Sequence, residues 1–131
     1  MAVLGVDIGG TKIAVGIVND AAEVTNATTI PTRAGEGFDV SIGQVYKAIA
    51  DCLRPDVRAI GICAPGPLNP KTGVVINPPN LPGWRNIPLA KLVGDRFGLP
   101  CRVENDANAA GLAEAHFGAA QGYSSVFYVT L

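Results

Sequence analysis

The 131-residue sequence has little charge, and neither sign forms a long run. Ten lysines and arginines stand against 11 acidic residues, for a net charge of −1. Nucleic acids and anionic membrane surfaces attract proteins through concentrated basic patches. The composition therefore argues against both as partners.

Cysteine is also scarce. The three cysteines, Cys52, Cys63 and Cys101, are odd in number and far apart, unlike a disulfide framework or a metal-binding knuckle. We expect reduced, buried thiols of a cytosolic protein. The sequence has no apolar run of 18 residues and no basic segment of the kind that opens a secretory signal, so a cytoplasmic location is predicted. A hydrophobic content of 48% is enough to form the core of one domain without disulfides.

The first part of the sequence predicts three strands joined by turns. Apolar and β-branched residues dominate 2–8, 13–18 and 23–30. Between them, Gly9-Gly10 and Asn19-Asp20 are residues that tolerate left-handed backbone, as hairpin turns require. Two consecutive antiparallel hairpins are therefore expected.

Helices and strands alternate in the rest of the sequence. The expected helices are 39–53, 89–97 and 106–117, and the expected strands are 57–63, 101–104 and 125–131. Between 64 and 88 lies a long loop that holds seven of the ten prolines and is interrupted only by the short run 74–76. This order predicts an α/β fold whose mixed sheet has three antiparallel strands, additional parallel strands and helices on its faces.

The sequence stops inside an apolar strand pattern, at 126–131, without a polar tail. Natural chain ends are usually exposed and loosely ordered. We therefore expect a truncated chain, the alternative being a final strand that ends naturally at its last core residue.

The first candidate site is the turn between the first two strands, Asp7-Ile8-Gly9-Gly10-Thr11-Lys12. It differs from a Walker A loop because Thr precedes Lys and a strand follows. Two glycines still allow consecutive backbone N–H groups to converge on a phosphate, to which Thr11 and Lys12 add a hydroxyl and a cation. Asp7 could hold Mg²⁺ directly or through water. The alternative is an ordinary glycine hairpin with a surface lysine.

The second candidate site is Glu104-Asn105-Asp106-Ala107-Asn108, where a strand leads into a helix. Asp106 is expected at the cap or in the first turn, where the helix dipole favours a carboxylate. In phosphoryl transfer such a group can orient the attacking hydroxyl and accept its proton. The alternative is that Asp106 only caps the helix.

The third candidate site lies in the proline-rich loop. Its prolines stiffen the backbone and lower the cost of ordering polar groups against a ligand. Asn80 can both donate and accept hydrogen bonds, as a sugar hydroxyl requires. Trp84 could stack on a sugar face, but burial in the core is the commoner role of an aromatic side chain and is predicted here.

Taken in order, the three motifs resemble the ROK family of bacterial sugar kinases and related repressors, which has a ribonuclease H-like, actin-like ATPase fold. The resemblance covers essentially all 131 residues. It implies that residues 1–131 are the N-terminal domain of a glucokinase-like enzyme that uses Mg²⁺ and ATP on a hexose and forms a homo-oligomer. Asp7, Gly9, Gly10, Thr11 and Lys12 match the first phosphate loop.

By the same resemblance, Gly66, Asn80, Asn105 and Asp106 bind the sugar, and Asp106 is the catalytic aspartate. The family's second phosphate loop, its sugar-binding Glu and His, its zinc motif and its adenosine pocket have no counterpart here, so structural zinc is expected only in an absent C-terminal half. His116, the only histidine, is interpreted as a helix-face residue.

Two other functions remain open. A sugar-responsive transcriptional regulator of the same family would carry a DNA-binding helix-turn-helix ahead of this domain, whereas here Met1 stands directly before the first predicted strand. A non-catalytic sugar-binding module would explain the missing half. The kinase is favoured, and the isolated chain is expected to be inactive because it supplies one side of the cleft.

Overall fold

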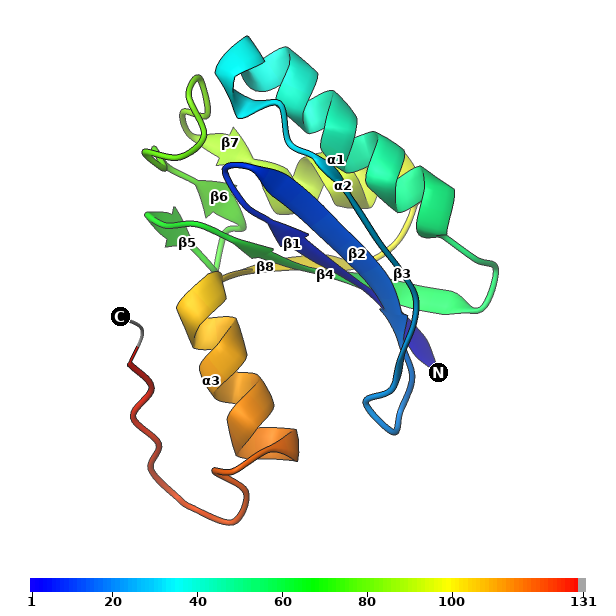
Figure 1. Cartoon of the computed structure of the whole chain (residues 1–131), viewed down its shortest axis with the longest axis vertical. Helices are drawn as coiled ribbons and strands as arrows, with labels where there is room; N and C mark the ends of the chain where they lie inside the picture. Colours follow the sequence, from blue (N-terminus) through cyan, green and yellow to red (C-terminus); the bar gives the residue numbers. More distant parts are fainter. Residues whose placement is uncertain (130–131) are drawn as a thin grey trace.

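The computed structural model describes residues 1–129, which fold around a five-stranded mixed sheet. The sheet order is β3-β2-β1-β4-β8, made of β1 (Ala2–Ile8), β2 (Lys12–Val18), β3 (Val24–Pro31), β4 (Val57–Ala64) and β8 (Cys101–Asn105) (Figure 1). Strands β1 to β3 pair antiparallel, whereas β4 and β8 run parallel to β1. The predicted α/β class and mixed sheet are confirmed.

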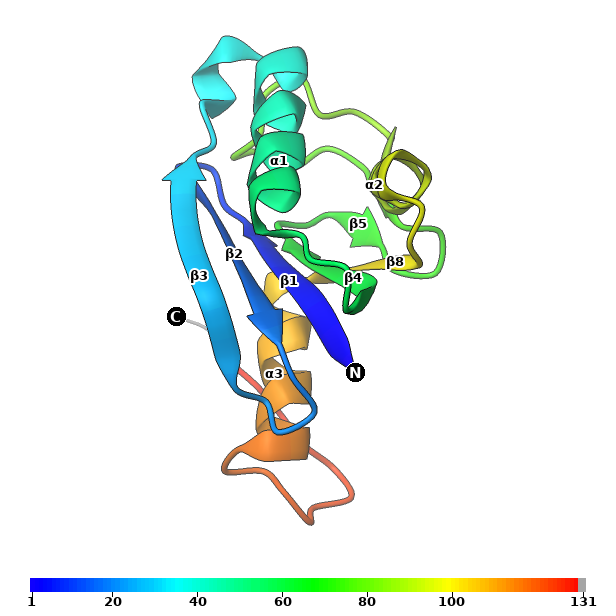
Figure 2. The same ribbon diagram turned by 90° about the vertical axis from the view of Figure 1, so that its right-hand side faces the viewer.

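Helices α1 (Phe38–Cys52) and α2 (Leu89–Phe97) lie on one face of the sheet (Figures 1 and 2). A 3-10 turn, η1 (Ala34–Glu36), precedes α1. Helix α3 (Asp106–Phe117) begins directly at the end of β8 and projects away from α1 and α2. None of the helices within residues 1–129 combines the length and the apolar character needed to cross a bilayer.

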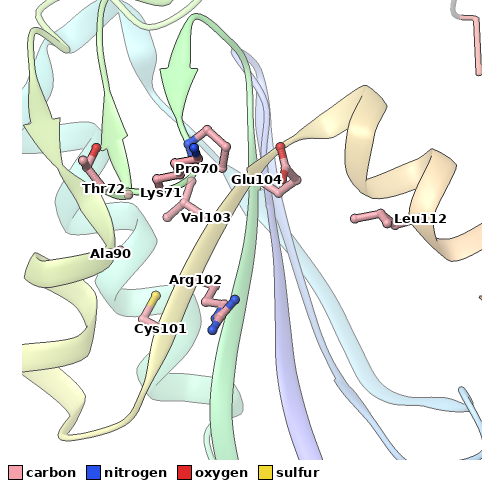
Figure 3. Close-up of a pocket in the computed structure, with 10 residues that line it drawn as sticks. Pro70, Lys71, Thr72, Ala90, Cys101, Arg102, Val103, Glu104 and Leu112 are labelled. Carbon is pink, nitrogen blue, oxygen red and sulfur yellow. The ribbon is translucent and has the colours of Figure 1, made fainter.

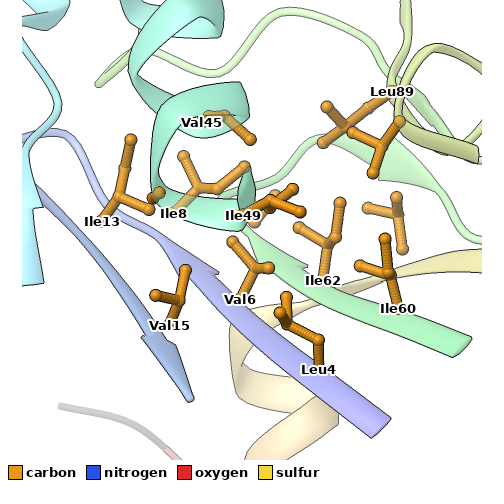
Figure 4. Packing of buried hydrophobic residues seen from close by; sticks show 14 of the residues in the cluster. Leu4, Val6, Ile8, Ile13, Val15, Val45, Ile49, Ile60, Ile62 and Leu89 are labelled. Carbon is orange, nitrogen blue, oxygen red and sulfur yellow. The ribbon is translucent and has the colours of Figure 1, made fainter. Parts of the chain in front are cut away.

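The core lies between the sheet and helices α1 and α2 (Figure 4). Alternation along β1 directs Leu4, Val6 and Ile8 into it, where Val45 and Ile49 of α1 pack against them. Full burial of such side chains contributes about 1.5–3 kcal/mol each. This packing fixes the carboxyl ends of β1, β4 and β8 relative to one another.

The proline-rich segment is more ordered than the sequence predicted. Instead of one loop with a single short run, it contains a three-stranded antiparallel sheet of β5 (Leu68–Asn69), β6 (Val74–Val75) and β7 (Ile87–Pro88). Each strand has only two residues, too few for an alternating pattern to be recognised.

The strand expected over 125–131 is wrong for the part that the structure describes. Residues 125–129 have no regular secondary structure, and 130–131 lie outside the described residues. A strand needs a neighbouring strand to receive its backbone hydrogen bonds. This segment instead passes along α3, where Tyr128 approaches Gly111.

The expectations for two turns also need correction. Gly9 and Gly10 do not have positive φ, and in the second hairpin the left-handed residue is Ala22 rather than Asn19 or Asp20. The Asn19 side chain fixes that turn by accepting hydrogen bonds from the amides of Ala21 and Glu23.

Among the three free cysteines, only Cys52 is buried. Cys63 is partly exposed because its strand position faces away from the main core. Cys101 pairs in register with the buried Ile60 and packs against the core, but it is partly exposed at the start of the edge strand β8. The expectation that all three thiols are buried is therefore wrong for these two.

Candidate phosphate and sugar site

Three side chains form a row across the carboxyl ends of the parallel strands. Asp7 of β1 pairs in register with Cys63 of β4, which pairs with Glu104 of β8. Residues in register on neighbouring strands point to the same face. These three therefore lie opposite the core face occupied by α1 and α2, where Ile8 and Ile62 are buried.

Asp106 adds a further carboxylate to this end of the sheet. Partial burial raises the pKa of Asp7, the nearby Asp106 carboxylate raises it further, and Lys12 lowers it. Lys12 of the same hairpin and Asp106, which is distant in the sequence, are thus both close enough to Asp7 to act on its carboxylate electrostatically. The structure brings the first and second candidate motifs together.

The loop between β1 and β2 is a tight hairpin closed by a hydrogen bond from the Gly9 amide to the Lys12 carbonyl, at 2.9 Å. Within residues 1–129, the amide N–H groups of Gly10 and Thr11 donate to no protein acceptor. Thr11 and Lys12 are exposed. Two unpaired donors beside a cation form a suitable environment for phosphate oxygens.

Close packing, rather than positive φ, explains the two glycines of this loop. A Cβ on Gly9 would lie 3.1 Å from the Lys12 carbonyl oxygen, and one on Gly10 would lie 2.9 Å from the Asn80 Cβ. The second contact brings the third motif to the first, because it places the proline-rich loop directly against the phosphate loop.

A buried tryptophan anchors that proline-rich loop. Trp84 is fully buried, its ring packs edge-on against Phe38, and its indole N–H donates to the Ser41 hydroxyl at 2.7 Å. The prediction that Trp84 belongs to the core is confirmed. Asn80 itself remains exposed beside Gly10, with its amide available for a ligand.

At the β8–α3 junction Asp106 lies in the first helical turn, as predicted, but it is not the capping residue. The N-cap residue is Asn105, whose side chain accepts a hydrogen bond from the Ala107 amide at 3.0 Å, and Asp106 is the first helical residue. Asp106 is exposed and also accepts from the Ala107 amide, at 2.8 Å. The N-terminus of α3, which is the positive end of the helix dipole, therefore lies at the candidate site.

Gly66 lies beside this junction. A Cβ there would stand 2.9 Å from the Asn105 Nδ2, so a larger residue would displace the capping side chain. Of the four residues expected on the sugar side, Gly66, Asn105 and Asp106 are thus neighbours, while Asn80 lies at Gly10.

A cavity of about 610 Å³ runs along the outer edge of β8 (Figure 3). It is lined by Lys71 of the β5–β6 turn and by Arg102 and Glu104 of β8, among others. Only Glu104 is shared with the strand-end row. This cavity is therefore a neighbour of the candidate site and not the site itself.

Sequence reasoning assigned no role to Glu104 and Cys63 and did not identify Thr32. Glu104 accepts hydrogen bonds from the Asn105 amide at 2.8 Å and from Asn108 Nδ2 at 3.1 Å, and so braces the junction. Strand alternation and register could have placed Glu104 and Cys63 on the face of Asp7. No sequence pattern identifies Thr32, whose hydroxyl bonds the Gly9 carbonyl.

No group of three or more His, Cys, Asp or Glu side chains in the described part of the chain is arranged to hold a metal ion. His116 is an exposed residue of α3, as predicted. The predicted Mg²⁺ site therefore has one protein carboxylate, that of Asp7, and a bound nucleotide would have to supply further ligands.

Known sugar kinases resemble the chain in sequence. The chain is 37% identical to a glucokinase of Streptomyces coelicolor over 98% of its length, and it spans 40% of that protein. It is 33% identical to an N-acetylmannosamine kinase of Salmonella agona, with 88% of the chain and 40% of that kinase covered. The chain thus spans about two fifths of the curated relatives it matches.

A solved structure of a sugar kinase is also similar to the chain. A ROK family glucokinase from Streptomyces griseus, crystallised with glucose and AMPPNP, superposes with a TM-score of 0.83 at 40% identity. The superposition covers 93% of this chain and 38% of that one. The ROK family model matches residues 3–131, and with the fold and the three motifs in agreement, the chain belongs to the ROK family.

Proposed function

We propose that residues 1–131 are the N-terminal, actin-like domain of an ATP-dependent hexose kinase of the glucokinase type, the second domain lying outside this chain. The convergence of Asp7, Lys12 and Asp106 at one end of the sheet, where β1 turns into β2 and β8 leads into α3, is the observation that carries this proposal. Phosphoryl transfer depends mainly on positioning and on electrostatic stabilisation, and these residues supply both.

The loop Gly9–Lys12 binds phosphate in this proposal. The unpaired amides of Gly10 and Thr11 donate to phosphate oxygens, the Thr11 hydroxyl adds a donor, and Lys12 offsets the negative charge. Mg²⁺ bound with ATP would neutralise part of the phosphate charge. Asp7 would hold it directly or through water, which fits an ion that takes one or two protein carboxylates and completes its shell with phosphates and water.

Asp106 orients the attacking sugar hydroxyl and accepts its proton. Its position as the first residue of α3 places the carboxylate at the positive helix end, and Glu104 and Asn105 hold the backbone there. Gly66, Asn80 and Asn105 contribute to the sugar side, since the two amide side chains can donate to and accept from hydroxyl groups.

The substrate class is a hexose or a close derivative, because the relatives include kinases named for glucose and for N-acetylmannosamine. We further propose a cytoplasmic homo-oligomer that carries its structural zinc in the second domain. These parts of the proposal follow from the family.

The test is a coupled assay of ADP release by the protein expressed from its complete reading frame, with glucose, N-acetylmannosamine and other hexoses. Turnover that requires Asp106 supports the proposal. Sugar binding without turnover would overturn it in favour of a binding module. A reading frame that adds a helix-turn-helix ahead of Met1, with no turnover, would favour the sugar-responsive regulator.

A further inference from the structure

Thr32 is a fully buried polar residue that follows directly after β3. Its hydroxyl donates to the Gly9 carbonyl at 2.7 Å, and its backbone N–H donates to the Thr11 carbonyl at 2.9 Å. One residue thus bonds to both sides of the Gly9–Lys12 loop. Because 23 residues separate Thr32 from Gly9, this connection is tertiary rather than part of the hairpin itself.

The surroundings of Thr32 make the connection rigid. The preceding carbonyl, that of Pro31, accepts a hydrogen bond from the Gln44 side chain of α1 at 2.8 Å. Pro31 also pairs in register with Lys12. The loop is therefore tied through Thr32 to the end of β3 and, through Pro31, to α1.

A buried hydroxyl contributes little net stability but is costly to leave unpaired. Its main effect here is geometric. With the carbonyls of Gly9 and Thr11 held by Thr32, the intervening peptide groups are fixed, and the unpaired amides of Gly10 and Thr11 keep one direction before any ligand arrives. Preorganised donors bind more tightly because less ordering entropy is lost on binding.

We propose that Thr32 is a positioning residue for nucleotide phosphate, acting through Gly9 and Thr11 without touching the ligand. The inference rests on the proposed function, because it takes the Gly9–Lys12 loop as the phosphate loop. Loss of the Thr32 hydroxyl then weakens nucleotide binding and leaves proton transfer at Asp106 and sugar binding unchanged.

The variants are Thr32→Val, which keeps the shape and removes the hydroxyl, and Thr32→Ser, which restores it. The first measurement is hydrogen exchange in the 131-residue chain without nucleotide. In Thr32→Val, exchange of the Gly9 amide should accelerate about 3- to 10-fold, the effect of losing roughly one net hydrogen bond, while Thr32→Ser stays near wild type. The Ile62 amide in the core strand β4 reports any global loss of stability.

The second measurement is steady-state kinetics on the protein from the complete reading frame. Thr32→Val should raise the KM for ATP roughly tenfold with kcat and the sugar KM within about twofold of wild type, and Thr32→Ser should recover. Equal increases in the KM for ATP and the KM for sugar would overturn the inference. So would a Gly9 amide whose exchange in Thr32→Val accelerates no more than that of the Ile62 amide, which reports global unfolding. A wild-type protein without sugar kinase activity would overturn the proposed function, and the exchange data alone would then decide whether Thr32 holds the loop.

Discussion

The side chain of Asn80 lies against the backbone of Gly10, so closely that a Cβ added to Gly10 would stand 2.9 Å from the Asn80 Cβ and 3.0 Å from its carbonyl oxygen. The proposed phosphate loop and the proposed sugar loop are therefore in direct contact. A side chain added at Gly10 must therefore be accommodated by the sugar loop.

Gly10→Ala tests this contact. Because part of the clash is with backbone, the loops must move, and we expect the free energy of unfolding to fall by about 1–3 kcal/mol. Gly43→Ala is the matched control, since Gly43 lies within α1 and its Cβ would meet nothing within 4 Å. It should be neutral or raise stability by about 0.5–1 kcal/mol. Urea unfolding of both variants provides the measurement, and equal stability of the two would refute the contact.

The Ser41–Trp84 hydrogen bond should be a strongly coupled pair. Ser41→Ala leaves the buried indole N–H unpaired and should cost about 1–3 kcal/mol. Trp84→Phe removes that donor, so the double variant should cost less than the sum of the two single changes. Trp84 is the only tryptophan, so the Trp84→Phe variants have no tryptophan fluorescence to follow. Unfolding should therefore be measured by circular dichroism. Additive effects would show that the bond does not hold the loop.

Asp7 should make stability depend on pH. Since burial and Asp106 raise its pKa in the folded state, the protonated form is favoured by folding, and this contribution is lost as pH rises through the folded pKa. Asp7→Asn should therefore match wild type below about pH 4, near the ordinary pKa of aspartate, and be more stable at neutral pH. Denaturant unfolding of both proteins at steps of about one pH unit, from about pH 3 to about pH 8, measures the two free energies of unfolding.

A control for this effect is the same substitution made in an Asp106→Asn background. The gain from Asp7→Asn should be smaller there, because one of the two causes of the raised pKa has been removed. A gain of unchanged size would mean that Asp106 does not act on Asp7.

The proposed roles of Asp106 and Lys12 predict different kinetic changes in the protein from the complete reading frame. Asp106→Asn should lower kcat by roughly two to four orders of magnitude with little change in sugar affinity, as expected for loss of a general base. Lys12→Ala should raise the KM for ATP instead. Asp95→Asn, at an exposed ion pair on α2, is a control that should leave both parameters unchanged.

Steady-state kinetics with direct sugar binding separate these outcomes. If Asp106→Asn kept near-normal kcat and lost sugar affinity, Asp106 would be a sugar ligand and not the base.

The isolated 131-residue chain should show no sugar kinase activity. It spans about two fifths of the relatives it matches, and one side of a cleft cannot orient both substrates. ADP release with glucose or N-acetylmannosamine should equal the background rate. Turnover that Asp106→Asn abolished in this chain would contradict the expectation.

Local signals in the sequence were enough to predict much of the site. Strand β1, its glycine hairpin and the Asn105–Asp106 junction depend on neighbouring residues, and all three lie where the sequence placed them. The Gly10–Asn80 contact and the Thr32 hydrogen bond could not be predicted, because they join residues far apart in the chain.

The errors have a related origin. The two-residue strands β5 to β7 depend on tertiary pairing, and the apolar residues from 125 to 129 resemble a strand but have no paired neighbour within the described residues. Hydrophobic pattern alone cannot report whether a partner strand is present.

The position of Cys63 between Asp7 and Glu104 has a consequence for redox chemistry. Burial, together with the carboxylates of Asp7, Asp106 and Glu104, raises the pKa of the Cys63 thiol. The thiolate is the form that peroxides and alkylating reagents attack, and three negative charges nearby suppress it. Burial and the neighbouring carboxylates therefore both disfavour the reactive thiolate of a sulfur that is still partly exposed beside the proposed phosphate site.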